Sequence, residues 1–173
     1  MQPHTIRPAV QTDLPAIVAI YNSAVPGRQA TADLQPVSVA SRQAWFDAHS
    51  GNRPLYVVEN PAGQVLAWGS FSDYYPRHAY RISAEISIYV HQHARGSGLG
   101  RRLAEYMCAQ APALGINNII AVIFAHNTPS IRLFSALGFS EWGRLPQVCD
   151  METFIADVVI LGRETKENSR TAL

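Results

Sequence analysis

A glycine-rich turn, RGSGLG at residues 95–100, is the segment of this sequence best suited to hold an anion. Its three glycines have no Cβ, so their backbone N–H groups can approach a ligand closely. The helix expected to follow adds the partial positive charge of its N-terminus, which favours a phosphate or pyrophosphate. Arg95 and Arg101 flank the turn and can neutralise further negative charge. The alternative is an ordinary turn between a strand and a helix.

Two familiar phosphate-binding motifs do not match this turn. The dinucleotide fingerprint needs a third glycine where this chain has Arg101. A P-loop needs Gly-Lys-Ser/Thr, and the lysine of this chain, Lys166, lies far from the turn. A nucleotide- or dinucleotide-binding domain is therefore the weaker alternative.

A carboxylate lies on the strand expected before the turn, at residues 82–90. Side chains of a strand alternate between its two faces, and here one face is apolar. The other face carries Ser83, Glu85, Ser87 and Tyr89. On an outer sheet these groups would meet water, but under covering helices Glu85 must occupy a polar cavity. Burial would then raise its pKa from about 4.3 toward the range of a general base.

The elements that position these residues follow from hydrophobic spacing and turn residues. The order is β α α β β β α β α β β, which predicts a mixed α/β sheet covered by helices on both faces. We expect one domain over residues 1–163 and a polar tail over 164–173. Pro112 is expected to kink the third helix near its end. The expected helix N-caps are Thr12, Ser38 and Thr128.

Composition narrows the class of protein. The chain has 173 residues, of which 47% are hydrophobic and 16% charged, so a disordered chain is excluded. A net charge of +1 predicts no nucleic-acid partner. No apolar run reaches the roughly 20 residues of a membrane span, and the first ten residues lack the core of a signal peptide. Cys108 and Cys149 have neither metal nor disulfide spacing. We expect a cytoplasmic protein without a metal site and without a membrane partner.

The run AEISIYVHQHARGSGLGRRL, residues 84–103, resembles the acetyl-CoA motif of the Gcn5-related N-acetyltransferase (GNAT) superfamily. That motif is a strand, then Arg/Gln-x-x-Gly-x-Gly/Ala, then a helix. The pattern Glu-x-Ser-Ile-Tyr-Val-His, with HNTPSIRLFSALGF at 126–139, resembles the phosphinothricin and methionine sulfone acetyltransferase branch. IYNSAV, followed by WF, fits the same branch, so the similarity spans most of residues 5–163. It implies the GNAT fold, with a central, mostly antiparallel sheet of about seven strands.

The resemblance implies acetyl-CoA as the co-substrate. The backbone of residues 88–90 would pair with the pantetheine arm, and the glycine turn would hold the pyrophosphate. Asn127 would bind the arm near the thioester; alternatively it only starts a helix. The cofactor-binding residues so implied are Ile88, Tyr89, Val90, Arg95, Gly96, Ser97, Gly98, Leu99, Gly100, Arg101, Asn127 and Ser130.

The resemblance also implies the chemistry, which is transfer of the acetyl group to a primary amine. An alkyl ammonium has a pKa of about 10, so a base must remove its proton. Glu85 occupies the position of the base in this branch, acting through a water; otherwise it is a structural or substrate-orienting carboxylate. A strand amide near residues 89–90 would donate to the oxyanion. Phe134 stands where relatives carry a tyrosine or histidine that protonates the thiolate, which leaves Tyr89 and His126 as weak candidates.

The resemblance places the acceptor pocket in the aromatic, basic stretch before the Glu85 strand, at Arg77, His78, Ala79 and Tyr80. Arg28 is a second candidate clamp for a carboxylate. The implied acceptor is a small amino acid or analogue, although the Thr-x-x-aromatic pattern of herbicide-acetylating relatives is missing. Alternatively, the stretch is only an exposed aromatic loop. For the protein as a whole, the alternatives are an acetyltransferase that acts on a polyamine or a peptide N-terminus, and an acetyl-CoA sensor without turnover. Analogy with relatives suggests a homodimer.

Overall fold

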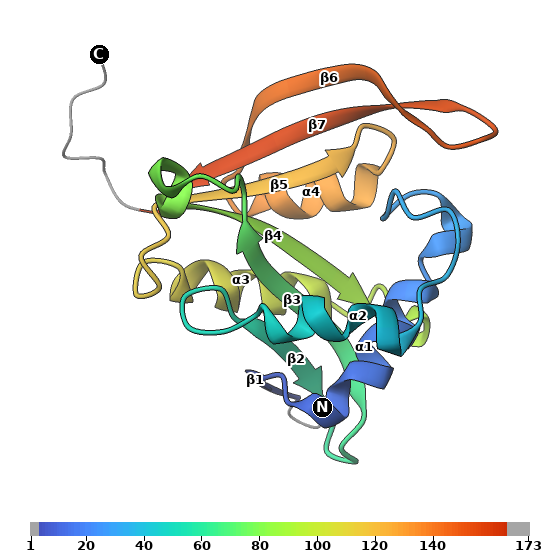
Figure 1. Ribbon diagram of the computed structural model, residues 1–173, viewed down its shortest axis with the longest axis vertical. Coiled ribbons are helices and arrows are strands. Elements are labelled where there is room, and N and C mark those ends of the chain that lie inside the picture. The colour runs from blue at the N-terminus through green and yellow to red at the C-terminus, as the bar shows by residue number, and fades with distance from the viewer. Residues whose placement is uncertain (1–3, 166–173) are drawn as a thin grey trace.

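The computed structural model describes residues 4–165, which build one seven-stranded sheet flanked by four α-helices (Figure 1). The strands are β1 (Thr5–Pro8), β2 (Leu55–Glu59), β3 (Val65–Asp73), β4 (Ser83–Val90), β5 (Asn118–Phe124), β6 (Ser140–Asp150) and β7 (Ile155–Glu164). The helices are α1 (Leu14–Asn22), α2 (Val39–Asp47), α3 (Leu99–Gln110) and α4 (Thr128–Ala136). The strand order is β1-β2-β3-β4-β5-β7-β6, and β4 with β5 is the parallel pair. The expected mixed, mostly antiparallel sheet is confirmed.

Two hydrophobic layers cover the sheet, one on each face. Leu103 and Met107 of α3, with Phe134 of α4, pack against one set of strand side chains that includes Phe71 and Ile86. The side chains that point the opposite way pack under α1 and α2, where Ile17, Ile20, Val57 and Trp68 form a second cluster. Burial of these two apolar faces stabilises the sheet, because each strand alternates between them.

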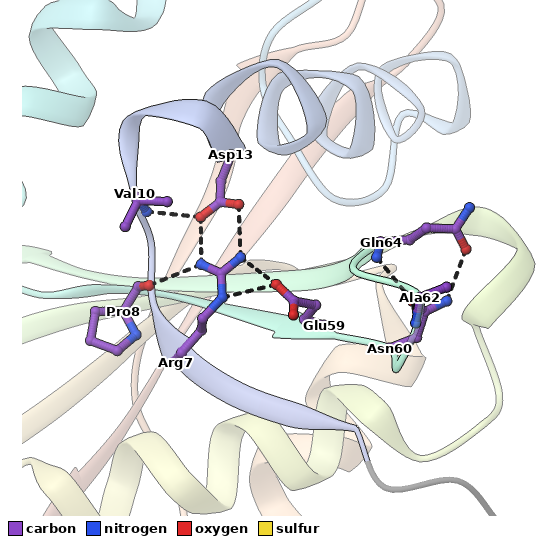
Figure 2. Close-up of polar contacts among 8 residues, drawn as sticks. All are labelled: Arg7, Pro8, Val10, Asp13, Glu59, Asn60, Ala62 and Gln64. Atoms are coloured by element: carbon purple, nitrogen blue, oxygen red, sulfur yellow. Dashed lines mark hydrogen bonds and ion pairs between the residues drawn. The ribbon is translucent and has the colours of Figure 1, made fainter.

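A fork of ion pairs fixes the N-terminal strand to the first helix, as Figure 2 shows. Arg7 Nη1 and Nη2 donate to the Asp13 carboxylate at 2.7 and 3.0 Å, and its Nε donates to Glu59 at 2.9 Å. Asp13 also accepts the Val10 backbone N–H at 2.8 Å. Arg7 lowers the pKa of the Asp13 carboxyl by hydrogen bonding to its charged form. These contacts join β1, β2 and the start of α1.

Several local expectations need correction. Thr12 does not cap the first helix. Asp13 is the N-cap residue of α1, but its side chain makes no cap hydrogen bond there and instead accepts the Val10 N–H ahead of the 3-10 turn at Gln11–Asp13. Asn127, not Thr128, caps α4, since its Oδ1 accepts the Ser130 N–H at 3.3 Å. The expected Ser38 cap of α2 is confirmed by its bond to the Ser41 N–H at 3.1 Å.

Two expected boundaries also shift. Helix α3 ends at Gln110, before Pro112, so the proline follows the helix instead of kinking it. Strand β7 runs to Glu164, and the Thr165 hydroxyl donates to the Ile116 carbonyl at 2.6 Å. The fold thus continues past residue 163, and the rest of the expected tail lies outside the described residues. Among the helices of residues 4–165, none combines the length and apolarity required to span a bilayer.

Candidate functional site

The site lies where β4 and β5 separate. These strands pair only from Ser83 to Glu85, opposite Asn118 to Ile120, while β4 stays paired with β3 as far as Val90. Beyond Glu85, the edge of β4 that faces β5 therefore has no strand partner among the described residues. Figure 1 shows the two strands diverging toward the loop between α1 and α2. Ligands commonly bind at the carboxyl ends of adjacent parallel strands, where such a crevice opens.

A cavity of about 590 Å³ occupies the wide end of this gap. Its walls come from the free edge of β4, the glycine-rich turn and the first turns of α3 and α4. The residues expected to bind the cofactor line this cavity, except Ser97, whose hydroxyl donates to the Ala94 carbonyl at 2.5 Å. One concave surface thus joins segments that are about 40 residues apart in the sequence.

The glycines of the turn serve two different purposes. Gly96 and Gly98 have φ values of +76° and +84°, a region that side-chain-bearing residues rarely adopt. A Cβ at either position would meet no protein atom within 4 Å, so the space beside the backbone is open. Gly100 instead allows close packing of α3 on the sheet, because a Cβ there would lie 3.3 Å from Val90 Cγ2.

The charge at the start of α3 favours an anion. The first turn of the helix contains no acidic residue and carries Arg101 and Arg102. Cations at a helix N-terminus oppose the helix dipole, so this arrangement is unfavourable unless a negative ligand offsets it. Arg101 lies on the cavity wall and forms an exposed i,i+4 pair with Glu105 at 2.8 Å. The turn has the shape and the charge of a phosphate site.

Two smaller cavities meet at Glu85. One, of about 270 Å³, follows the free edge of β4 and shares Tyr89, Asn127 and Phe134 with the large cavity. The other, of about 230 Å³, lies on the α1–α2 face of the sheet. Glu85 is half-buried, and burial alone raises the pKa of its carboxyl, with no ion-pair partner contributing. The unpaired carboxylate therefore lines both smaller cavities, and the one along β4 connects it to the large cavity through shared residues.

The cavity on the α1–α2 face is lined by both polar and aromatic side chains. Arg42 lies over the Tyr21 ring at 4.7 Å and donates to Asp33 at 2.9 Å. The residues that line this cavity and that the sequence analysis did not single out include Tyr21, Arg42, Trp45, Ser70 and Ser72. The alternation of Trp68, Ser70 and Ser72 marks one face of β3, but only the β3–β4 register brings that face beside Glu85.

The loop between α1 and α2 bridges the gap between the separated strands. The Tyr89 hydroxyl on β4 donates to the Ala30 carbonyl at 2.9 Å. From the other side, Asn127 Nδ2 donates to the Gln29 carbonyl at 3.0 Å, and His126 Nε2 lies 2.9 Å from the Arg28 carbonyl. Gln29 and Ala30 line both cavities of the gap, so the loop covers the passage between them.

Comparison with known proteins agrees with this geometry. Residues 15–139 match the model of the Acetyltransferase (GNAT) family. The chain belongs to this family. It is an acetyl-CoA-dependent N-acetyltransferase.

Two curated relatives and one solved structure show how close the similarity is. The chain is 47% identical over 160 residues to the protein of Bacillus subtilis (strain 168) provisionally named phosphinothricin acetyltransferase YwnH, covering 92% of this chain and 98% of that one. It is 41% identical over 145 residues to the L-methionine sulfoximine/L-methionine sulfone acetyltransferase of Pseudomonas paraeruginosa (strain DSM 24068 / PA7), covering 83% and 84%. The GNAT superfamily phosphinothricin acetyltransferase of Sinorhizobium meliloti, solved in complex with AcCoA, is 33% identical with a TM-score of 0.91, covering 98% and 92%.

None of the residues expected to bind the acceptor lines the three cavities described around β4. Arg77, His78, Ala79 and Tyr80 are exposed near the 3-10 turn before β4 and line none of the cavities described in residues 4–165. Arg28 lines none of these cavities either, and its guanidinium donates to the Leu34 carbonyl at 2.8 Å and to Glu152 at 2.9 Å. Its side chain secures the bridging loop instead.

The residues considered for thiolate protonation are poorly suited to it. Phe134 is 4% exposed, packs edge-on against Phe139 and lines both cavities of the gap. Burial raises the pKa of the Tyr89 hydroxyl, and its proton is already donated to Ala30. His126 stacks on Phe124 and bonds to the bridging loop. A side-chain acid for the leaving thiolate is therefore not among these three.

Proposed function

We propose that this enzyme acetylates the primary amine of a small amino acid or amino-acid analogue, and that Glu85 is the general base, acting through a water. One observation carries the proposal: the unpaired carboxylate of Glu85 lines both the 270 Å³ cavity along the free edge of β4, which adjoins the large cavity, and the 230 Å³ polar cavity on the α1–α2 face. A base must reach the attacking amine, and the amine must reach the thioester. Glu85 lines both the cavity proposed for the amine and the cavity that follows β4 toward the thioester.

The residues of the large cavity fit acetyl-CoA. The pyrophosphate binds at Gly96 and Gly98, beside Arg101, where open space and positive charge coincide. The pantetheine arm lies along the free edge of β4 at residues 88–90 and takes the place of a neighbouring strand. This placement directs the thioester toward Glu85. A backbone N–H of residues 89–90 is then positioned to stabilise the oxyanion.

The proton balance assigns Glu85 its role. An acceptor ammonium loses one proton to Glu85 through water, and the neutral amine attacks the thioester carbonyl. The resulting tetrahedral nitrogen loses a second proton, and coenzyme A leaves as a thiolate that takes one proton. Because the pKa of Glu85 is raised by burial, the carboxylate is a better base than an exposed one. Phe134 cannot donate a proton, so the thiolate takes its proton from water or from the attacking amine.

The acceptor class rests on the relatives and on the polar cavity. The two curated relatives are named for phosphinothricin and for methionine sulfoximine or sulfone. A cavity of about 230 Å³ with an arginine and a carboxylate in its walls suits a small zwitterion better than a long polyamine. A sensor without turnover has no use for an unpaired, half-buried carboxylate in this place, so an enzyme is favoured.

A homodimer remains part of the proposal. Trp142, Leu145, Val148 and Ile155, on the hairpin of β6 and β7, are each between 44% and 54% exposed. A second copy of the chain would cover this apolar surface. Sedimentation at micromolar concentration tests this part, and a monomer across that range contradicts it.

Glu85→Gln tests the proposed base. We measure thiol release from acetyl-CoA with L-methionine sulfone and with phosphinothricin. The expected loss in kcat at neutral pH is about 10²–10⁴-fold, with the Kd of acetyl-CoA unchanged. Activity of the parent enzyme falls as the pH drops through the raised pKa of Glu85, and the variant lacks this acid limb.

Ser87→Ala is the matched control, because Ser87 follows Glu85 on the same face of β4 and lines the same two cavities. This control should retain activity within about threefold, because a neutral hydroxyl contributes little beside a charged base. Equal activity of Glu85→Gln and the parent at every pH contradicts the role of Glu85.

A further inference from the structure

Ser72 and Glu85 are cross-strand partners on the polar face of the sheet. The register of β3 and β4 places them directly opposite each other, and both line the cavity under α1 and α2. Side chains in such pairs have Cβ atoms about 4.5–5.5 Å apart. Any group that approaches the Glu85 carboxylate from this cavity therefore also meets the Ser72 hydroxyl.

His49 fixes the direction of that hydroxyl. Its Nδ1 lies 2.7 Å from the Trp45 carbonyl oxygen, which can only accept, so Nδ1 carries the ring proton. Its Nε2 lies 3.3 Å from Ser72 Oγ. In neutral histidine this nitrogen has only a lone pair, so Ser72 must donate to it. Burial lowers the pKa of His49, which keeps the ring neutral at neutral pH.

The consequence is a hydroxyl that can only accept from the cavity. The Ser72 hydroxyl has one proton, which it donates in the hydrogen bond to His49. Only the lone pairs of Oγ therefore remain for a ligand. An ammonium group only donates, and it needs acceptors for its three N–H bonds. We propose that Ser72 Oγ, together with the water through which Glu85 acts, receives the ammonium group of the acceptor, with His49 as the positioning residue. This inference rests on the proposed function.

The arrangement makes acceptor binding sensitive to the charge of His49. A protonated ring would donate from Nε2 to Ser72 and turn the hydroxyl proton toward the cavity, against the incoming ammonium. On the cavity side, the ionisable groups facing this pair are Arg42, Glu85, Tyr21 and Tyr89. On the other side of His49, a cavity under β1 and β2 contributes Tyr56. Beyond Ser72 along β3, Asp73 is paired with Arg53 at 2.8 Å.

Ser72→Ala is the first test, with L-methionine sulfone as acceptor. Loss of a hydrogen bond to a charged group should raise the KM of the acceptor about 10- to 100-fold, while the KM of acetyl-CoA stays within about twofold. Ser135→Ala is the control: Ser135 is exposed on α4 and lines none of the described cavities. It should leave both KM values within about twofold. An unchanged acceptor KM in Ser72→Ala overturns the proposal.

A second measurement needs no variant. The ¹⁵N shifts of the His49 ring in the parent protein should show the proton on Nδ1 at neutral pH. Saturating L-methionine sulfone together with coenzyme A should lower the pKa of this ring, because a ligand that prefers the neutral form must stabilise it. A proton on Nε2, or a pKa that the acceptor does not move, overturns the proposal.

These outcomes distinguish the inference from the proposed function. If Glu85→Gln abolishes turnover while Ser72→Ala behaves like Ser135→Ala, the role of Glu85 as base is supported and the ammonium subsite is wrong. If the parent enzyme acetylates neither L-methionine sulfone nor phosphinothricin, the proposed acceptor class fails and the subsite fails with it.

Discussion

Replacing Gly98 with alanine separates backbone strain from ligand contact. At φ +84° an alanine is strained, although its Cβ would meet no protein atom within 4 Å. The strain should lower the free energy of unfolding by about 1–2 kcal/mol. For a chain of this length that corresponds to about 2–4 °C in Tm for each kcal/mol. If the open space beside Gly98 belongs to the pyrophosphate, the added methyl also displaces a backbone N–H···phosphate bond. Acetyl-CoA affinity should then fall about 10- to 100-fold.

Gly63→Ala supplies the matched control for strain. Gly63, in the β2–β3 hairpin turn, has φ +78° and the same open space beside its backbone, but it lines none of the three cavities around β4. Calorimetric titration with acetyl-CoA and thermal unfolding of both variants complete the experiment. Both should lose similar stability, and only Gly98→Ala should lose affinity. Equal affinity in the two variants would refute the placement of the phosphate at this turn.

Two further predictions concern charge. Arg101→Ala should weaken acetyl-CoA binding about 5- to 30-fold at low salt, and the difference in Kd between variant and parent should shrink as the salt concentration rises. Glu105→Ala breaks the same i,i+4 pair and should not weaken binding, so equal losses in a salt titration argue against phosphate contact by Arg101. Asp13→Asn should lower unfolding free energy by about 2 kcal/mol near neutral pH. Because the pKa of Asp13 is lowered, the stabilisation is lost as the pH falls through it. Urea unfolding should therefore show that the difference in unfolding free energy between the parent and Asp13→Asn is smaller at acid pH than at neutral pH. A difference that does not change with pH contradicts the lowered pKa.

The glycine turn and the Glu85 strand were predictable because their signals are local. Positive-φ glycines next to a helix start, and strict alternation along a strand, both involve neighbours in sequence. The family resemblance depended largely on the same segments, and the family and fold that it implied are confirmed. Helix caps were less reliable. Asn127, not Thr128, accepts a free N–H at the start of α4, and Asp13, not Thr12, is the N-cap residue of α1, where its side chain makes no cap bond.

The acceptor side was not predictable in this way. Arg28 has the chemistry of a carboxylate clamp, yet Glu152, more than 100 residues away, already binds it. Ser72 and His49 carry no motif, because a lone serine and a lone histidine occur in any sequence. Only the β3–β4 register and the packing of α2 on the sheet bring them beside Glu85.

The sequence by itself determined the order of elements, the glycine-rich turn and the polar face of β4, since each depends on residues close together in the chain. Tertiary structure decided where β4 and β5 separate, which loop bridges them, and which side chains share the cavity at Glu85. Those features arise from pairing and packing between distant segments, and one residue of strand register would turn Ser72 to the opposite face.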